Sequence, residues 1–230
     1  MPVVELLTSS SLGSLLGMRH ALEPDHLAAV STLVSRERSS LRAAWLGVCW
    51  GLGHTFSLLL IGIALVLLRA EMPASVSDVF ECGVAVMLIA LGLRAILQAM
   101  RQGPDGPMHI HRHGGLVHSH NGSSGHVHLG SWTLARRPLF VGAIHGLAGS
   151  GALTALVLTT LPTTAARLSY MALFGLGSTV GMAALSGLLG WPLARLGTNQ
   201  MVVRGVTFLV GFLSTGFGVY WGYAAVTRLI

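Results

Sequence analysis

Four side chains with metal-binding chemistry lie close together near the start of the chain: His20, Glu23, Asp25 and His26. The residues on either side are largely apolar, so these ionisable groups lie within a hydrophobic stretch rather than in a surface loop. Ionisable groups in a membrane interior are costly, and they usually pair, bind a cation or line a polar pathway. Imidazole and carboxylate at short spacing also form the ligand set of first-row transition metals. The segment therefore predicts a metal site in a membrane protein.

The composition independently predicts an integral membrane protein. Hydrophobic residues make up 52% of the chain, charged residues make up 10%, and the mean hydropathy is +0.69. Soluble domains contain about 25% charged residues. Since a spanning helix needs about 20 apolar residues, we expect an all-α fold with six transmembrane helices, the first of them retained rather than cleaved as a signal peptide. The six segments are 4–34, 43–68, 79–100, 138–161, 170–194 and 205–227.

The chain has no lysine, so arginine is its only permanently positive side chain. By the positive-inside rule, the arginine distribution predicts a multi-pass protein of the cytoplasmic (inner) membrane with both termini outside. The net charge of +6 thus follows from topology, and no basic stripe interleaved with aromatic residues indicates nucleic-acid binding. The cytoplasmic arginines would be Arg36, Arg38, Arg42, Arg101, Arg112, Arg136, Arg137, Arg195 and Arg204, against Arg69, Arg167 and Arg228 outside.

The sequence contains an internal repeat with a period of about 125 residues. Gly17–His20 matches Gly142–His145, and Gly51–Thr55 matches Gly175–Thr179 at nearly the same offset. Each half would hold three spans, and an odd number inverts the second half relative to the first, which is an architecture of transporters. The chain then divides into a first three-helix repeat, a histidine-rich cytoplasmic loop and a second three-helix repeat, at 1–100, 101–136 and 137–230.

Pro24 decides whether the first group of ligands can converge. On an unbroken helix, at about 100° per residue, Asp25 would lie about 140° and His26 about 240° around the axis from His20. Such an arrangement cannot chelate one ion. Proline lacks the N–H that would bond the carbonyl of His20, so we expect the helix to be broken near Pro24 and the side chains on either side to converge.

Two further histidines lie alone in later spans. His54 follows two glycines and precedes a threonine, and His145 precedes a stretch of small residues. We expect both to complete or gate the metal site, although a lone histidine in a span is also often held by a hydrogen bond between helices. Glu23 could be a ligand, a partner that orients an imidazole or a proton acceptor. The alternative for the whole cluster is a buried ion-pair group in which Arg19 balances a carboxylate.

Seven histidines occupy a short polar segment between the third and fourth spans. Its composition of Gly, Ser, Asn and His predicts no packed core and no regular structure without metal. We interpret it as a cytoplasmic metal store or sensor, with a solvated or pH-responsive linker as the alternative. The seven are His109, His111, His113, His118, His120, His126 and His128.

The segment from His20 to His26 resembles the His-x4-Asp-His signature of the nickel/cobalt transporter (NiCoT) family, and its residue sequence is most similar to that of the UreH-like branch. Gly51–Thr55 resembles the second signature of the family, and Gly142–Ala152 resembles a block of UreH-like proteins. The resemblance implies transport of Ni²⁺ or Co²⁺, with His20, Asp25 and His26 as essential residues. Larger members have eight spans and a further acidic signature, which this chain lacks. Cytoplasmic metallochaperones of urease or hydrogenase maturation would be partners.

The sequence therefore predicts a permease in the lipid bilayer that takes up Ni²⁺, with Co²⁺ or Zn²⁺ as the alternative ions. We expect it to have no cofactor and no enzymatic activity. The absence of a nucleotide-binding motif excludes ATP hydrolysis by this chain. One alternative is an exporter on the same scaffold. The other is a membrane-embedded zinc hydrolase in which Glu23 acts as general base. Cys49 and Cys82 are single and form no CxxC, so they predict core residues rather than a thiol relay.

Overall fold

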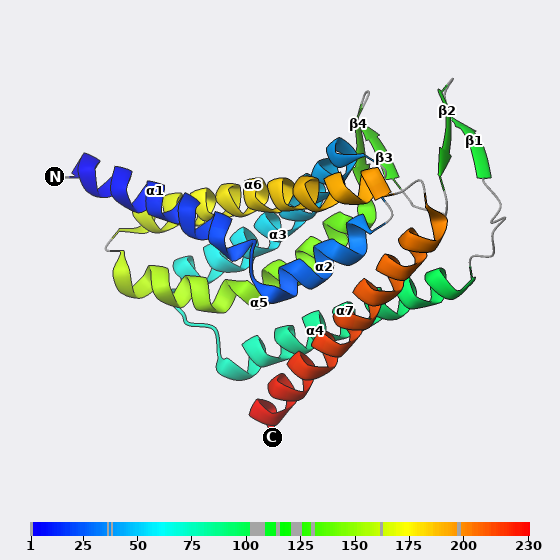
Figure 1. Cartoon of the computed structure of the whole chain (residues 1–230). Coiled ribbons are helices and arrows are strands. Elements are labelled where there is room, and N and C mark those ends of the chain that lie inside the picture. Colours follow the sequence, from blue (N-terminus) through cyan, green and yellow to red (C-terminus); the bar gives the residue numbers. More distant parts are fainter. Residues whose placement is uncertain are drawn as a thin grey trace.

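The computed structural model describes residues 2–35, 37, 39–101, 109–113, 116–120, 126–129, 132–161, 163–196 and 199–230. These residues form seven helices and two antiparallel β-hairpins (Figure 1). The helices are α1 (Pro2–His20), α2 (Pro24–Val34), α3 (Ser40–Leu68), α4 (Ala74–Arg101), α5 (Arg136–Thr160), α6 (Thr164–Leu196) and α7 (Gln200–Leu229). The strands are β1 (His109–His113), β2 (Leu116–His120), β3 (His126–Leu129) and β4 (Trp132–Ala135).

The long helices run between two ends of the molecule. The end at which α3, α5 and α7 begin also carries the hairpins, and we call it the hairpin side (Figure 1). The other end, where α1, α4 and α6 begin and α7 ends, is called the terminal side. Helices α1, α3, α5 and α6 pack together, whereas α4 and α7 form a separate pair that contacts the rest mainly through α2 and α5.

The first hydrophobic segment is broken at the expected place. Helix α1 ends at His20, the next three residues form a turn in which the Glu23 amide donates to the His20 carbonyl at 3.0 Å, and α2 begins at Pro24. Glu23 has extended backbone angles of φ −64° and ψ 149°. Proline suits the first position of a helix, because its missing N–H has no partner there in any helix. The expected break near Pro24 is therefore confirmed.

Small and hydroxyl-bearing residues allow α3 and α6 to approach closely. The Thr55 hydroxyl donates to the Gly175 carbonyl at 2.8 Å and lies 3.0 Å from the Thr179 hydroxyl. A Cβ atom on Gly51 would lie 2.6 Å from the Cα atom of Thr179, too close for any residue but glycine. Such contacts are typical of helix pairs in membranes, where close packing and interhelical hydrogen bonds hold helices together.

The pair of α4 and α7 is joined at both its middle and its end. The Ser214 hydroxyl donates to the Leu88 carbonyl at 3.0 Å near the middle of the two helices. At the terminal side, Arg228 Nε donates to Asp78 Oδ1 at 2.7 Å, and the same guanidinium also bonds Glu81. One cation therefore ties the end of α7 to two carboxylates on the first two turns of α4.

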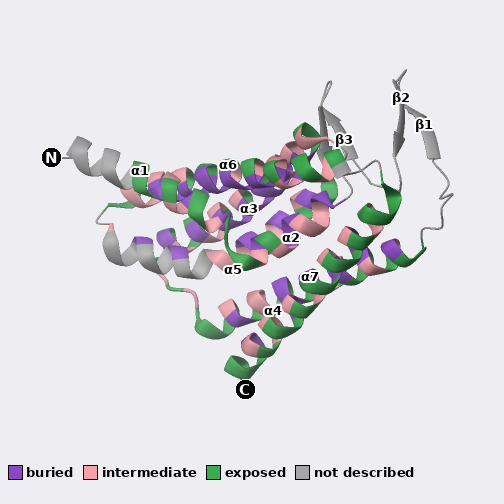
Figure 2. Cartoon of the chain, in the orientation of Figure 1, coloured by how far each residue is buried: buried purple, intermediate pink, exposed green. Residues whose placement is uncertain are grey.

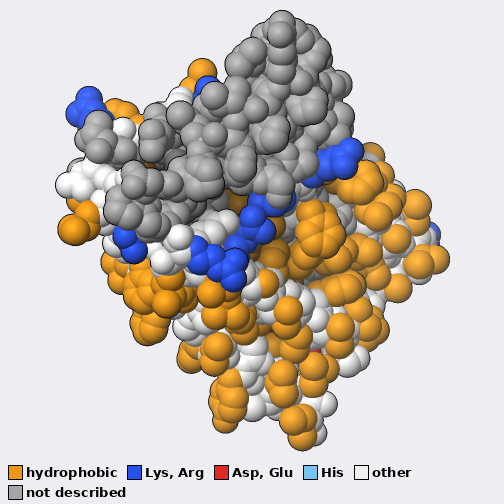
Figure 3. Space-filling view, turned by 90° about the vertical axis from the view of Figure 1, so that its right-hand side faces the viewer, with side chains coloured by type: hydrophobic (Ala, Val, Ile, Leu, Met, Phe, Trp, Pro, Cys, Tyr) orange, Lys and Arg blue, Asp and Glu red, His pale blue; other side chains and the backbone are white. Residues whose placement is uncertain are grey.

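Four helices are long and apolar enough to cross a membrane: α3, α4, α6 and α7. Many of their exposed side chains are large and apolar, and these cover the outside of the bundle (Figures 2 and 3). In Figure 3, arginine side chains form a band along one border of this hydrophobic surface. The all-α membrane fold is confirmed at this level. Of the six expected spans, the one formed by α1 with α2 and the one formed by α5 remain predictions.

The expectation that the histidine-rich loop lacks regular structure is wrong for its described residues. Strands β1 and β2 pair antiparallel, with His109 opposite His120 and His111 opposite His118, and β3 pairs with β4. Histidine alternates with residues such as isoleucine and valine along these segments, and a period of two with β-branched residues suits paired strands. Composition alone therefore misled, because the alternation was the stronger signal.

Candidate metal centre

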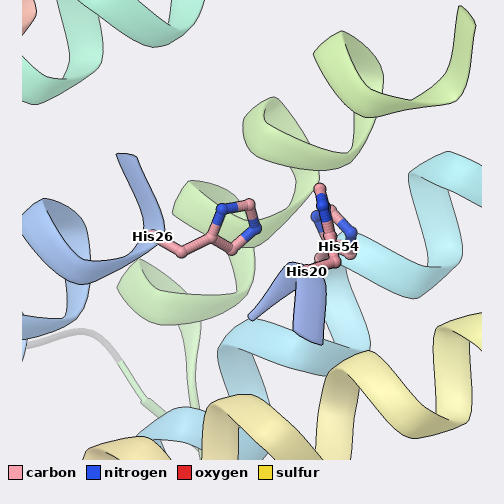
Figure 4. A group of neighbouring side chains, drawn as sticks. All are labelled: His20, His26 and His54. Carbon is pink, nitrogen blue, oxygen red and sulfur yellow. The ribbon is translucent and has the colours of Figure 1, made fainter. Parts of the chain in front are cut away.

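Four histidines and one aspartate from four helices meet in the interior of the protein. His20 is the last residue of α1, Asp25 and His26 lie in the first turn of α2, and His54 and His145 lie within α3 and α5. The ring centre of His26 lies 4.5 Å from that of His20, 5.4 Å from that of His54 and 4.7 Å from that of His145. Figure 4 shows the His26 ring directed toward His20 and His54. The structure thus brings together residues that are up to 125 positions apart in the sequence.

The potential ligand atoms form two groups, each compact enough to hold an ion. His20, His26 and His54 form one group, and Asp25, His26 and His145 form the other. Within each group the ligand atoms lie within 4.8 Å of one another. His26 belongs to both groups. The first consists of imidazoles alone, whereas the second contains a carboxylate, and both suit a borderline transition-metal ion better than Mg²⁺ or Ca²⁺.

Asp25 positions two of the histidines. Its Oδ1 atom accepts the backbone N–H of His26 at 2.9 Å and lies 3.0 Å from His26 Nδ1. Its Oδ2 atom lies 3.4 Å from His145 Nε2. An Nδ1–H that donates to the carboxylate leaves the lone pair of His26 on Nε2, available to a metal, as in many metal sites where a carboxylate orients a histidine ligand. Asp25 is therefore both a potential ligand and a group that fixes a ring.

Several of the ring nitrogens are buried without a hydrogen-bond partner. In the described part of the chain, His20 Nε2, His26 Nε2, His145 Nδ1 and both nitrogens of His54 are in this state. Leaving a buried polar atom unpaired costs about 1–3 kcal/mol. A purely structural cluster would be expected to satisfy these atoms. The interpretation of His54 as a histidine held by a hydrogen bond between helices is wrong for this structure, because neither of its nitrogens is bonded.

The carboxylates of the motif pair with histidines rather than with an arginine. Asp25 contacts two imidazoles, and Glu23 Oε2 lies 3.0 Å from His20 Nδ1. The Glu23 side chain is 54% exposed and belongs to neither ligand group. Of the three roles that the sequence left open for Glu23, this geometry fits that of a partner that orients an imidazole. The Glu23 carboxylate contacts Nδ1 of His20, while Nε2 of the same ring is buried.

A cavity of about 790 Å³ leads to the cluster. His20, Asp25, His26 and His145 line it together with groups farther out, among them Glu23 and Glu81. Four further lining residues lie toward the terminal side: Leu153 in the second half of α5, Tyr170 and Phe174 in the first third of α6, and Trp221 in the last third of α7. The cavity therefore gives access to the cluster from the terminal side.

The seven loop histidines lie apart from this cluster in the sequence, and their backbones lie in β1, β2 and β3. Their side chains are outside the described part of the structure, as are residues 102–108, 114–115 and 121–125. Their role in binding metal is therefore still a prediction.

Comparison with known proteins assigns the chain to a family. The model of the NicO family, described as high-affinity nickel-transport protein, matches residues 7–215. The chain belongs to this family. A urease accessory protein, UreH, of Bacillus sp. (strain TB-90) is 34% identical over 97% of the chain and 94% of its own length. The expected membership of the nickel/cobalt transporters, in the UreH-like branch, is thereby confirmed, and so is the expected role in nickel transport.

Two plant proteins are more distant relatives of this NicO-family chain. The chloroplast proteins FOR GROWTH AND FERTILITY 2 and 1 of Arabidopsis thaliana are 28% and 26% identical over about four-fifths of the chain. The chain spans 48% and 50% of their lengths. No solved structure matches the chain.

Two aromatic residues beside the cluster were missed by the sequence interpretation of this NicO-family chain. The Trp50 ring centre lies 5.3 Å from that of His26 and 5.7 Å from that of His145, and the Phe174 ring centre lies 5.3 Å from that of His20. The repeat could have revealed them. Trp50 directly precedes Gly51 and Phe174 directly precedes Gly175, so the two occupy equivalent positions in the matched segments.

Proposed function

We propose that the chain is a permease of the cytoplasmic membrane that takes up Ni²⁺ or Co²⁺ and binds the ion at His20, Asp25, His26, His54 and His145. The observation that carries this proposal is the set of buried, unpartnered imidazole nitrogens beside one carboxylate, at the end of a cavity. A bare divalent ion is too costly to place in hydrocarbon, so the protein must replace its water ligands in turn. Neutral imidazoles and a carboxylate can do so while neutralising part of the charge.

The proposed direction depends on the orientation of the chain. Most arginines that the positive-inside rule counts lie on the hairpin side, which would place the hairpins in the cytoplasm and both termini outside. The cavity would then face the outside, from which an importer receives its ion. The seven loop histidines would lie in the cytoplasm, where the ion is released, and there they could store metal or sense its concentration.

The helix contacts support two inverted three-helix repeats, one on each side of the loop at 101–136. Helix α1 packs on α6 as α5 packs on α3. A Cβ atom on Gly17 would contact the carbonyl of Phe174, and one on Gly142 would contact the carbonyl of Trp50, so equivalent glycines meet equivalent partners. A pseudo-two-fold relation between the halves would produce this pairing, with the site near the middle where they meet.

The proposal is tested by the accumulation of radioactive Ni²⁺ in cells that express the wild type, His20→Ala or a deletion of residues 108–130. We expect the wild type to accumulate nickel, His20→Ala to accumulate no more than cells without the protein, and the loop deletion to keep most of the activity. Wild-type cells that hold less nickel than cells without the protein would instead indicate export. Equal nickel content in all strains would contradict nickel transport through this site.

Glu23→Gln provides a milder test of how His20 is oriented. Loss of a partner that orients a metal ligand typically costs about 10–100-fold in metal affinity. Because Glu23 is half exposed, we expect the lower end of this range, seen as a rise of about tenfold in the apparent KM of uptake at an unchanged maximal rate. Glu71→Gln, an exposed change between α3 and α4, is the matched control and should have no effect. Complete loss of uptake in Glu23→Gln would instead make Glu23 an essential ligand or proton acceptor.

A further inference from the structure

The five proposed ligands do not form one compact group. The ligand atoms lie within 4.8 Å of one another only in two sets of three. With metal–nitrogen bonds of about 2.0–2.1 Å, even ligands on opposite sides of an ion lie only about 4 Å apart. Each set of three can therefore close on an ion with small adjustments, whereas one ion cannot be held by all five ligands in this arrangement.

The two groups lie beside different aromatic residues, which come from helices that begin at opposite ends of the molecule. Phe174 and Trp50 each lie ten residues into their helices, but α6 begins at the terminal side and α3 at the hairpin side. At about 1.5 Å per residue, each ring lies about 15 Å from its own end. Phe174 contacts His20, of the all-imidazole group, and Trp50 contacts His26 and His145, of the group that contains Asp25.

The two groups differ in how far the cavity reaches them. Phe174 lines the cavity that opens toward the terminal side. Trp50 is fully buried and belongs to a hydrophobic cluster that includes Val30, Leu88 and Met182. The cavity reaches all three residues of the group that contains Asp25, together with His20, whereas His54 does not line it and is fully buried.

We propose that the transported ion moves between two positions that share His26. The first is formed by His20, His26 and His54 beside Phe174, and the second by Asp25, His26 and His145 beside Trp50. The ion keeps one protein ligand throughout and exchanges the other two, so that it passes between a neutral set of ligands and a negatively charged one. Each position supplies only three protein ligands, so the ion is never fully enclosed and can be released. This inference rests on the proposed function.

The test measures binding and transport separately, with Co²⁺ as the probe. The full-length protein, with its seven loop histidines changed to asparagine and purified by a tag without histidine, is placed in lipid nanodiscs for binding and in liposomes for transport. Binding is followed by equilibrium dialysis and by the visible spectrum of Co²⁺. The variants are His54→Ala, which removes a ligand of the first position, and His145→Ala, which removes one of the second. His54→Leu and His145→Leu repeat the comparison with side chains that fill the space.

We expect the wild type to bind one Co²⁺ per chain. Each variant should still bind one, with an affinity within about tenfold of the wild type, and the spectra of the two variants should differ. Transport should fall by at least about a hundredfold in both, because the ion can no longer pass from one position to the other. Cys49→Ala removes a buried thiol on α3 that belongs to neither group, and it should leave both measurements unchanged.

Three results would overturn the inference. Parallel loss of binding and transport in both alanine and leucine variants would indicate a single composite site. Two ions bound at once in the wild type would exclude a shared His26, and full transport by either variant would make one position dispensable. A wild type that binds and transports no Co²⁺ or Ni²⁺ would instead contradict the proposed function itself.

Discussion

Replacing His26 with alanine is expected to reduce Ni²⁺ uptake to the level of cells that lack the protein, a loss of at least about a hundredfold. His26 is the one side chain that belongs to both ligand groups among the described residues. Its ring is buried, and the bond between its Nδ1 atom and Asp25 leaves Nε2 directed toward the other imidazoles. Without this ring each group retains only two ligands, too few to replace the water molecules of the ion.

The measurement is the initial rate of uptake of radioactive Ni²⁺ at equal amounts of folded protein in the membrane. Folding is checked by size-exclusion chromatography, because alanine leaves a space in the core and removes the partner of Asp25. His118→Ala, in strand β2, is the matched control for the loss of one imidazole and should keep most of the uptake. A folded His26→Ala protein with more than about a tenth of wild-type uptake would contradict the shared-ligand role.

The helix break and the convergence of the candidate ligands could be predicted from the sequence because both depend on short-range rules. The position of Pro24 between His20 and Asp25 predicts the helix break that lets these candidate ligands converge. His54 and His145 could be proposed as ligands since a lone ionisable ring in an apolar span requires an explanation. These inferences needed only the type of each residue and its neighbours.

Features that depend on distances between helices could not be predicted in this way. The division of the ligands into two groups that share His26 requires the relative positions of α1, α2, α3 and α5, which no spacing specifies. Trp50 and Phe174 were missed because an aromatic residue in an apolar span is ordinarily core or lipid contact. The hairpins of the loop were missed for another reason, since composition was given more weight than alternation.

Gly142→Ala is expected to abolish uptake although it adds a single methyl group. Its Cβ atom would lie 2.8 Å from Cδ1 of Trp50 and 2.9 Å from the backbone nitrogen of His54, and closer still to the carbonyl oxygen of Trp50. Real Cβ atoms essentially never approach other atoms within 3.0 Å. The obstruction is mainly backbone, so α3 and α5 must move apart. Overpacking of this kind typically costs about 1–3 kcal/mol, occasionally more, and here it also separates His54 from His145.

Gly205→Ala is the matched control, because the same methyl group there meets nothing within 4 Å. Alanine favours a helix over glycine by about 1 kcal/mol, so this variant should be as stable as the wild type or more so, and should transport normally. The two variants are compared by thermal unfolding in detergent and by Ni²⁺ uptake. The contrast isolates the contact between α3 and α5, since the chemical change is identical. If Gly142→Ala matched Gly205→Ala in both measurements, the close approach of α3 and α5 would be wrong, and with it the relative positions of His54 and His145 on which the two ligand groups depend.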